Sequence, residues 1–498
     1  MPDTVPKSWP HFQSQMARKI WGQMDLHLDL ADVPGRSLRA RLENALREGV
    51  RSGRLAPDTR LPSTRDLCTE LGVSRGVVVD AYAQLAAEGY LRTRRGGGTT
   101  VAPSVARDTG RAPSPARAPA VRYDLSPYRP ALSELPRREL AAALARVLRV
   151  MPDGRMGVPD PAGTIELRIA IASYLGRARG VQASAERVII TAGMRHGVGM
   201  VWRALVALGV RRIGIEQPGW RGIRETASAA GLTCVPLPVD EDGLVIDQLA
   251  AQRVDAVAVA PAHQYPTGAV LSAERRRLLL DWARTHDGLV IEDDFDAEYR
   301  YDHQPIGSLQ GLAPDHVVYG GSTSKTVAPS VRVGWLVVPA RLVEPVVEVQ
   351  QVRGTIASPL LQLAFADMIE RGELDRHLGR QRRRYRRRRE ALLTTLATAL
   401  PELTVRGAAA GLYVVLELPP HLDEEVVLAA ARARGIELEG GEGERPMLVI
   451  GYAGLNAGAA ERAVAALAAS LEEAGDAGRG ARKETGMPAV RRAAAGAA

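Results

Sequence analysis

Lys325 carries the side chain best suited to covalent chemistry in this sequence. The chain holds 65 lysines and arginines, yet Lys325 is the only lysine between residues 20 and 482. An amine, unlike a guanidinium, can lose its proton near neutral pH and attack a carbonyl carbon. Ser322 and Ser324 precede this lysine and Arg332 follows it, so hydroxyls and a bidentate guanidinium are available for a phosphate. The spacing predicts a site for a phosphorylated aldehyde, with the amine forming the imine.

Four further signals lie upstream of this lysine. Asp293 ends an apolar run and can hold a pyridine ring nitrogen in its protonated, electron-withdrawing form. Tyr265 stands in a turn from which its hydroxyl can reach a ring oxygen, and Trp220 can stack on the ring face. Gly193 and Met194 join an expected strand to a helix, where free backbone amides bind phosphate.

Each signal alone has an ordinary explanation. The acidic run 292–296 can bind Mg²⁺ or be solvated, a lone tryptophan is commonly a core residue, and a lone lysine is commonly on the surface. The five signals together, in this order, predict a pyridoxal 5'-phosphate site.

The elements that must position these residues are short apolar runs separated by helical patterns. Continuous apolar strands indicate a sheet covered on both faces, which predicts an α/β fold with a mostly parallel sheet. A smaller α+β part follows. The expected strands are 187–191, 212–216, 255–260, 289–293, 317–320 and 333–338, with a helix at 273–285.

The N-terminal region has a different pattern of apolar residues. Apolar spacing predicts helices over 37–52, 63–72 and 74–89, followed by a glycine-tipped hairpin over 90–101. This arrangement is a winged helix-turn-helix. The alternative is a small helical domain with solvated arginines.

DNA contacts are expected from the second helix, from the start of the third helix and from the wing. The residues at the start of the third helix enter the major groove in such folds, and the wing reaches phosphates or a minor groove. Arginine also reads guanine edges. The expected contact residues are Arg65, Ser74, Arg75, Gly76, Arg94 and Arg95.

The charge distribution supports a double-stranded DNA partner. Residues 1–122 hold 19 basic and 12 acidic side chains, a balance of +7, whereas residues 123–498 hold 46 and 45. Nearly all of the net charge of +8 therefore lies in the first quarter of the chain. A biased surface without a partner is the alternative.

Several protein classes are excluded by composition. No apolar run approaches a membrane span, and no signal peptide is recognisable. The two cysteines, Cys68 and Cys234, lack the spacing of a disulfide scaffold or a zinc site, so no metal is expected. We expect a cytoplasmic protein, associated with the nucleoid when it is bound to DNA.

Composition shifts divide the chain into six segments. They are an N-terminal segment (1–35), the winged helix-turn-helix (36–101), a Pro/Ala/Arg-rich linker (102–122), a large domain (123–340), a smaller domain (341–475) and a tail expected to be disordered (476–498).

The motifs resemble known families. The run SGRLAPDTRLPSTRDLCTELGVSRGVVVDAYAQLAAEGYL with its wing resembles a GntR-type winged helix, and residues 123–475 resemble a fold-type I aminotransferase. Together they resemble the MocR/GabR family of transcriptional regulators. The resemblance implies a head-to-tail homodimer and pyridoxal phosphate bound as an imine to Lys325. It also implies ring contacts from Asp293 and Trp220, and a phosphate site of Arg332, Ser322 and Ser324.

Three positions depart from the family pattern. Phe295 stands where the family often has tyrosine, Val449 where amino-acid-binding relatives place a carboxylate-binding arginine, and Gly222 where some relatives have a basic residue. These departures weaken both a transaminase activity and an amino-acid effector.

We therefore expect a DNA-binding regulator that senses pyridoxal phosphate itself, or an amine or amino acid, through the imine at Lys325. Of these effectors we favour pyridoxal phosphate. One alternative is a working aminotransferase with an accessory DNA-binding head, although we expect any transaminase activity to be weak or absent. Another is a DNA-binding protein whose body has lost the cofactor and only dimerises.

The run 380–389 contains eight arginines. They cannot share one face of a helix. We favour a structural or dimer-flanking helix over a second DNA contact.

Overall fold

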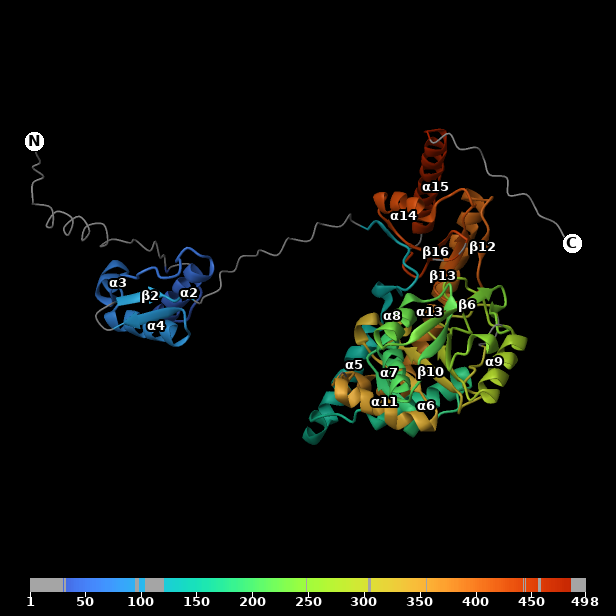
Figure 1. Cartoon of the computed structure of the whole chain (residues 1–498), viewed down its shortest axis with the longest axis horizontal. Helices are drawn as coiled ribbons and strands as arrows, with labels where there is room; N and C mark the ends of the chain where they lie inside the picture. The colour runs from blue at the N-terminus through green and yellow to red at the C-terminus, as the bar shows by residue number, and fades with distance from the viewer. Residues whose placement is uncertain are drawn as a thin grey trace, which may run out of the picture. The chain divides into compact units, whose positions relative to one another are not determined.

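The computed structural model divides the chain into two compact units, Met1–Ala118 and Pro119–Ala498 (Figure 1). It describes residues 30, 33–94, 98–103, 121–247, 249–302, 306–354, 356–441, 443, 445–455 and 458–484, with side chains as far as residue 476. Most of the predicted N-terminal segment and linker lies outside these residues. None of the described helices is long and apolar enough to cross a membrane.

The first unit is a winged helix-turn-helix, as the sequence predicts. Ser37 caps its first helix by accepting the amide hydrogen of Ala40, and Ser63 caps the second through Asp66. Ser74 takes the N-cap position of the third helix without a side-chain capping bond. The elements are α2 (Leu38–Arg51), α3 (Thr64–Glu70), α4 (Arg75–Ala87) and the antiparallel strands β1 (Leu91–Arg94) and β2 (Gly98–Val101).

An eight-stranded sheet forms the centre of the second unit, and the α/β fold expected from the sequence is confirmed. Its order is β4 (Val188–Thr191), β11 (Gly334–Val337), β10 (Val317–Ser322), β9 (Leu289–Asp293), β8 (Ala256–Val259), β5 (Arg212–Gln217), β6 (Thr233–Asp240) and β7 (Gly243–Leu244). Strands β10, β9, β8, β5 and β6 are parallel, whereas β11 runs antiparallel to both of its neighbours. The carboxyl ends of five parallel strands therefore meet at one edge of the sheet.

Helices cover both faces of this sheet. Along β4, Ile189 packs in one cluster with α7 (Met194–Ala207), α8 (Arg221–Ala229) and α11 (Ala340–Arg353). Val188 and Ile190 point to the opposite face, where α6 (Ile165–Arg179) lies. Farther along that face α9 (Ala273–Thr285) packs against Val290 of β9. Two more helices, α5 (Arg137–Val150) and α12 (Pro359–Glu370), pack against each other near α6.

A smaller antiparallel sheet contains β12 (Val405–Arg406), β13 (Tyr413–Glu417), β16 (Met447–Gly451) and β15 (Glu439–Gly440), in that order. Beside it lie α13 (Glu373–Ala399), α14 (Glu424–Ala433) and α15 (Ala459–Glu484) (Figure 1). The entry strand β3 (Tyr123–Asp124) pairs with β14 (Ile436–Glu437). A disordered tail is expected from residue 476, whereas helix α15 continues to Glu484.

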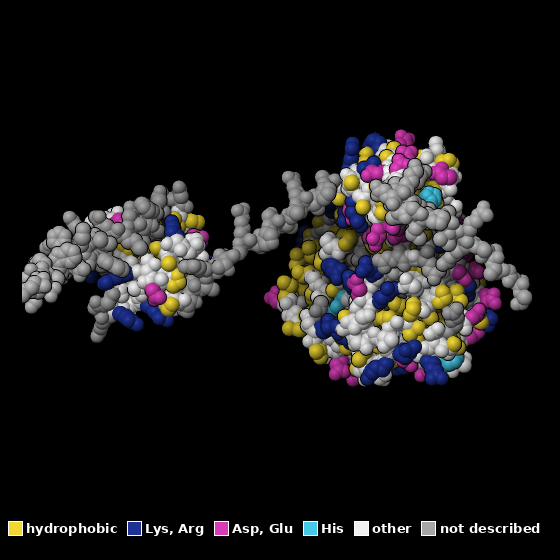
Figure 2. All heavy atoms as spheres, turned by 45° about the horizontal axis from the view of Figure 1, so that its top comes forward, with side chains coloured by type: hydrophobic (Ala, Val, Ile, Leu, Met, Phe, Trp, Pro, Cys, Tyr) yellow, Lys and Arg dark blue, Asp and Glu magenta, His cyan; other side chains and the backbone are white. Residues whose placement is uncertain are grey.

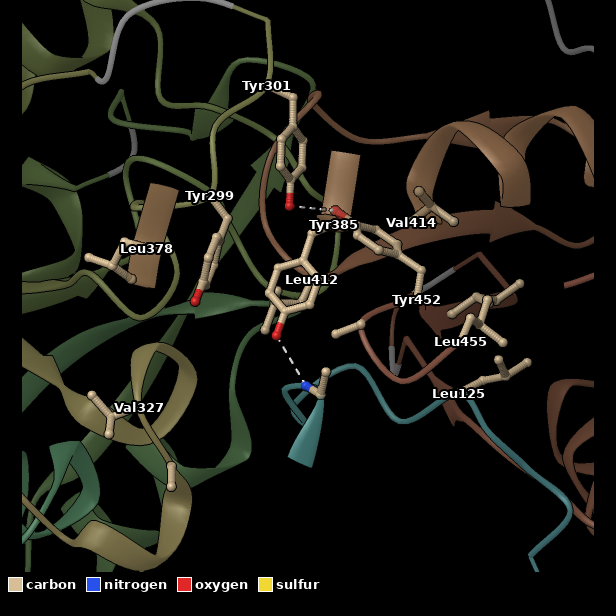
Figure 3. Packing of buried hydrophobic residues seen from close by; sticks show 14 of the residues in the cluster. Leu125, Tyr299, Tyr301, Val327, Leu378, Tyr385, Leu412, Val414, Tyr452 and Leu455 are labelled. Carbon is tan, nitrogen blue, oxygen red and sulfur yellow. Dashed lines mark hydrogen bonds between the residues drawn. The ribbon is translucent and has the colours of Figure 1, made fainter. Parts of the chain in front are cut away.

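Buried tyrosines tie the smaller sheet to the larger one (Figure 3). Tyr385 of α13 accepts the amide hydrogen of Ala131 over 3.1 Å, and its ring meets Tyr299 edge-on at 5.0 Å. Tyr452, which follows β16, donates to the hydroxyl of Tyr301 over 3.5 Å. Tyr299 and Tyr301 follow β9, so this cluster fixes the smaller sheet against the edge of the larger sheet that carries Asp293.

Most arginines of the run 380–389 bind the body of the second unit. Arg380 pairs with Glu139, and Arg384 and Arg388 pair with Glu134. Arg382, Arg386 and Arg389 donate to backbone carbonyls. These contacts favour a structural role, and not DNA binding, for these six arginines. On its visible face the second unit mixes basic and acidic side chains (Figure 2).

Candidate functional site

A cavity of about 300 Å³ opens at the carboxyl ends of the parallel strands. This is where ligands bind in open α/β sheets. Eight of the nine residues predicted for the cofactor line it: Lys325, Asp293, Trp220, Tyr265, Met194, Ser322, Ser324 and Arg332. The ninth, Gly193, directly precedes Met194 and packs against Arg332.

Lys325 lies in the short helix α10 (Thr323–Thr326), directly after β10. Its amine donates to the backbone oxygen of Tyr128 and lies 5.1 Å from the centre of that ring. Burial lowers its pKa to about 8, although the negative charges of Asp296 and Asp293 oppose the shift. A large share of the amine is therefore neutral near pH 8 and able to attack a carbonyl.

Asp293 ends β9, opposite Gly320 of β10. Burial, helped by Asp294 and Asp296, raises the pKa of its carboxyl to about 7. Its Oδ1 atom is buried and has no hydrogen-bond partner among the described residues. An unpartnered carboxylate oxygen beside a cavity is a strong acceptor for a cationic N–H of a ligand.

The start of α7 and Arg332 form a cradle for an anion. Gly193 has φ +99°, and a Cβ atom there would lie 3.3 Å from Nη1 of Arg332. Arg332 itself takes a left-handed conformation with φ +53°, which turns its side chain into the cavity wall. The hydroxyl of Ser322 accepts the amide hydrogen of Ser324 over 3.4 Å, so both residues are held at the same wall. Guanidinium, hydroxyls and free helix amides thus meet at one end of the cavity.

The opposite wall is mostly apolar. Trp220 precedes α8, and Gly222 leaves room for its ring, because a Cβ there would lie 2.4 Å from Cζ2 of Trp220. Phe295 and Val449 belong to one apolar cluster with Tyr265. Of the three departures, Phe295 lines the cavity, Gly222 packs under the Trp220 ring and Val449 lies in the apolar cluster, and none of them supplies a charged or hydroxyl group.

The hydroxyl of Tyr265 is already engaged in this structure. It donates to Oε2 of Glu439 in β15 over 3.0 Å, and its ring lies 4.8 Å from that of Tyr128. Burial, with the neighbouring Tyr128 and Glu439, raises the pKa of Tyr265 far above its usual value. Tyr265 therefore acts as a hydrogen-bond donor in the neutral form.

The sequence reasoning missed several residues of the cavity wall. Glu216, at the end of β5, accepts from the amide of Ala260 and from Gln264, each over 3.3 Å. Burial raises the pKa of Glu216 to about 8, so it is largely protonated at neutral pH. Arg195 and Arg224 also line the cavity. Glu216 ends the predicted strand 212–216, and Arg195 follows the predicted strand 187–191. Their position at strand ends was the sequence signal that could have identified them.

A second layer of buried charge lies behind Asp293. Asp294 accepts from Arg179 over 2.7 Å and from the hydroxyl of Tyr319 over 2.5 Å. Both oxygens of Asp296 lie 3.1 Å from Nδ1 of His263. The acidic run that ends β9 is thus divided, with Asp293 lining the cavity and its neighbours bonded within the protein.

The expected DNA contacts lie on the surface of the first unit. Ser74, Arg75 and Gly76 are exposed at the start of α4, Arg65 is exposed on α3, and Arg94 is exposed on β1. Arg95 lies outside the described residues. The exposed N-terminus of α4 is the end that a recognition helix presents to base edges.

Comparison with known proteins gives two family matches. Residues 131–467 match the family "Aminotransferase class I and II", and residues 38–101 match the family "Bacterial regulatory proteins, gntR family". The chain is 35% identical to the HTH-type pyridoxine biosynthesis transcriptional regulator PdxR of Corynebacterium glutamicum, over 86% of this chain and 94% of that protein. It is 34% identical to the probable rhizopine catabolism regulatory protein MocR of Rhizobium meliloti, over 82% of this chain and 86% of that protein.

Solved aminotransferases share the fold of the second unit. An archaeal alanine:glyoxylate aminotransferase superposes with a TM-score of 0.65 at 24% identity, over 70% of this chain and 91% of that one. The multiple substrate aminotransferase of Thermococcus profundus gives the same TM-score at 23% identity, over 71% and 92%.

Proposed function

Because the chain belongs to the MocR-type regulators, which join a GntR-family domain to an aminotransferase class I and II domain, we propose that it is a transcription regulator that binds pyridoxal 5'-phosphate and responds to a small ligand at that site. Its first unit binds double-stranded operator DNA. We place it in the cytoplasm, where such DNA lies, and we propose a head-to-tail homodimer.

The main support is that Lys325 and Asp293 line one cavity with complementary chemistry. Lys325 has an amine of lowered pKa, and Asp293 has a buried oxygen without a partner. A protonated pyridine nitrogen supplies the N–H that this oxygen lacks. The residues present therefore fit the cofactor.

Each wall has a task in holding the cofactor. Arg332, Ser322 and Ser324 bind the phosphate, together with the amides after Gly193. Trp220 covers the ring face. When bound, pyridoxal phosphate supplies an aldehyde that condenses with primary amines and a ring that withdraws electrons.

Asp293 keeps the ring nitrogen protonated, because a carboxylate in this buried position stabilises a neighbouring positive charge strongly. Lys325 provides the amine that holds the aldehyde. Tyr265 and Tyr128 close the side of the cavity nearest to this amine and limit the access of water.

We favour pyridoxal phosphate itself as the effector, with amines and amino acids as the other class. Phe295 lines the cavity and Val449 belongs to the same apolar cluster, and neither side chain gives a carboxylate a partner. Arg224 lines the cavity from α8, so an acidic ligand is the alternative that must be tested. Whichever ligand binds, it can change DNA affinity only by binding two states of the dimer unequally.

The experiment uses the full-length chain and its operator DNA. We expect purified protein to show the visible absorbance of bound pyridoxal phosphate, and Lys325→Ala to lose it while still binding DNA. Operator affinity should change with pyridoxal phosphate in the unchanged protein and not in the variant.

Three outcomes would contradict the proposal. Protein that never acquires visible absorbance has a body that only dimerises. Operator affinity that is indifferent to the cofactor removes it as an effector. Catalytic conversion of an amino donor to its keto acid, with many turnovers per chain, would indicate the aminotransferase alternative.

A further inference from the structure

A second cavity, of about 320 Å³, lies along α7 and shares Arg332 with the site described above. Arg195, Arg203 and Arg353 line it together with Arg332, and His196 lies among them. Only Arg195 and Arg332 belong to both cavities. We call this second cavity the α7 groove.

The α7 groove has a basic lining. Four of its lining residues are arginines and none is acidic. The pKa of Arg203 is lowered by burial and by the charge of Arg353. Glu225 pairs with Arg195 from outside the lining and compensates one of these charges. Like charges gathered in a partly buried space repel each other, and a bound anion would relieve this repulsion.

His196 adds an independent observation. Its Nδ1 accepts the amide hydrogen of Ala192 over 3.1 Å, so the proton of the neutral ring is on Nε2. The pKa of His196 is lowered by burial and by Arg332, Arg353 and Arg203, so the ring is neutral at pH 7. Its Nε2 has no hydrogen-bond partner among the described residues. The groove thus adds a neutral donor without an acceptor to its four cations.

We propose that the α7 groove binds a small phosphate-bearing anion, separately from the cofactor phosphate. Phosphate suits this lining because its oxygens accept hydrogen bonds only, and guanidinium groups hold them in pairs. Arg332 lines both sites, so a small anion bound in the groove would contact a residue of the cofactor site. The site itself does not depend on the proposed function.

The test measures binding of inorganic phosphate by calorimetry to the full-length, cofactor-loaded protein at constant ionic strength. Loading occupies the cofactor phosphate site, so further binding must occur elsewhere. We expect one phosphate per chain. Ala229→Glu, on the exposed face of α8, places a carboxylate in the groove and should weaken phosphate binding at least about tenfold.

Ser228→Glu is the matched control, because it adds the same charge one residue away and Ser228 does not line the groove. Arg203→Gln should weaken phosphate binding as Ala229→Glu does, and its visible absorbance should be unchanged, since Arg203 does not line the cofactor cavity. Phosphate binding that is absent, or equal in Ala229→Glu and Ser228→Glu, overturns the inference. If the protein never acquires visible absorbance, the cofactor proposal fails, while the comparison of the two glutamate variants still tests the groove.

Discussion

Arg179 and Asp294 form an ion pair of 2.7 Å in which each side chain is only 3% exposed. Asp294 follows Asp293 directly, and its backbone amide donates to the oxygen of Gly320 over 3.0 Å. The pair therefore fixes the end of β9 on the side away from the cavity. Asp293 can remain without a protein partner because its neighbour is anchored.

Breaking this pair should destabilise the protein strongly. Arg179→Met leaves the carboxylate of Asp294 buried without its cation, which costs about 3–5 kcal/mol. The exposed pair of Arg155 and Glu166 is the control, and Arg155→Met should cost about 1 kcal/mol or less. Urea unfolding monitored by circular dichroism measures both variants. Equal losses would mean that burial of the first pair does not matter.

Asp293→Asn should make the cofactor-free protein more stable at alkaline pH. The folded pKa of Asp293, about 7, lies above its ordinary value of 3.8, so between these values the folded chain holds a proton that the unfolded chain has lost. Stability from this group therefore falls as the pH rises from about 4 to about 7. At pH 8 the variant should gain at most about 4 kcal/mol, and the gain should vanish near pH 4.

The same variant should lose pyridoxal phosphate. Denaturation at pH 4.5 and pH 8, with and without cofactor, separates the two effects. A stability gain that is the same at both pH values would show that charge on Asp293 is not its cause.

Gly193→Ala should weaken cofactor binding through Arg332. The new Cβ would lie 3.3 Å from Nη1 of the guanidinium, which must move away from the phosphate position. Gly209→Ala is the control, because Gly209 also has a positive φ, +94°, but no atom lies within 4 Å of its Cβ position. Both substitutions should cost about 1–2 kcal/mol of stability, because alanine disfavours this backbone conformation. Only Gly193→Ala should raise the dissociation constant for pyridoxal phosphate, measured by visible absorbance.

Residues of the site could be predicted where a local sequence pattern marked them. Asp293 and Lys325 each stand at the end of an apolar strand, and adjacent parallel strands bring such ends together. Tyr128 was not predictable, since 197 residues separate it from Lys325 and no local pattern marks it. Strand β6 escaped prediction because it contains Pro236 and Pro238, which usually argue against a sheet position.

Arg75→Ala should weaken operator binding and reduce its dependence on salt. Arg75 is exposed at the first position of α4, where a contact to a phosphate releases bound counterions from the DNA. The slope of log K against log salt should become less steep by about 1 if Arg75 contacts one phosphate. An unchanged slope with weaker binding would indicate that Arg75 donates hydrogen bonds to a base edge and does not contact a phosphate. The double variant Arg383→Ala, Arg387→Ala provides the comparison, because these two exposed arginines of α13 make no hydrogen bond or ion pair within the described chain.

If α13 is structural, this double variant leaves the slope unchanged, because the other arginines of α13 already bind protein. A slope that falls as much as in Arg75→Ala would place DNA on the second unit.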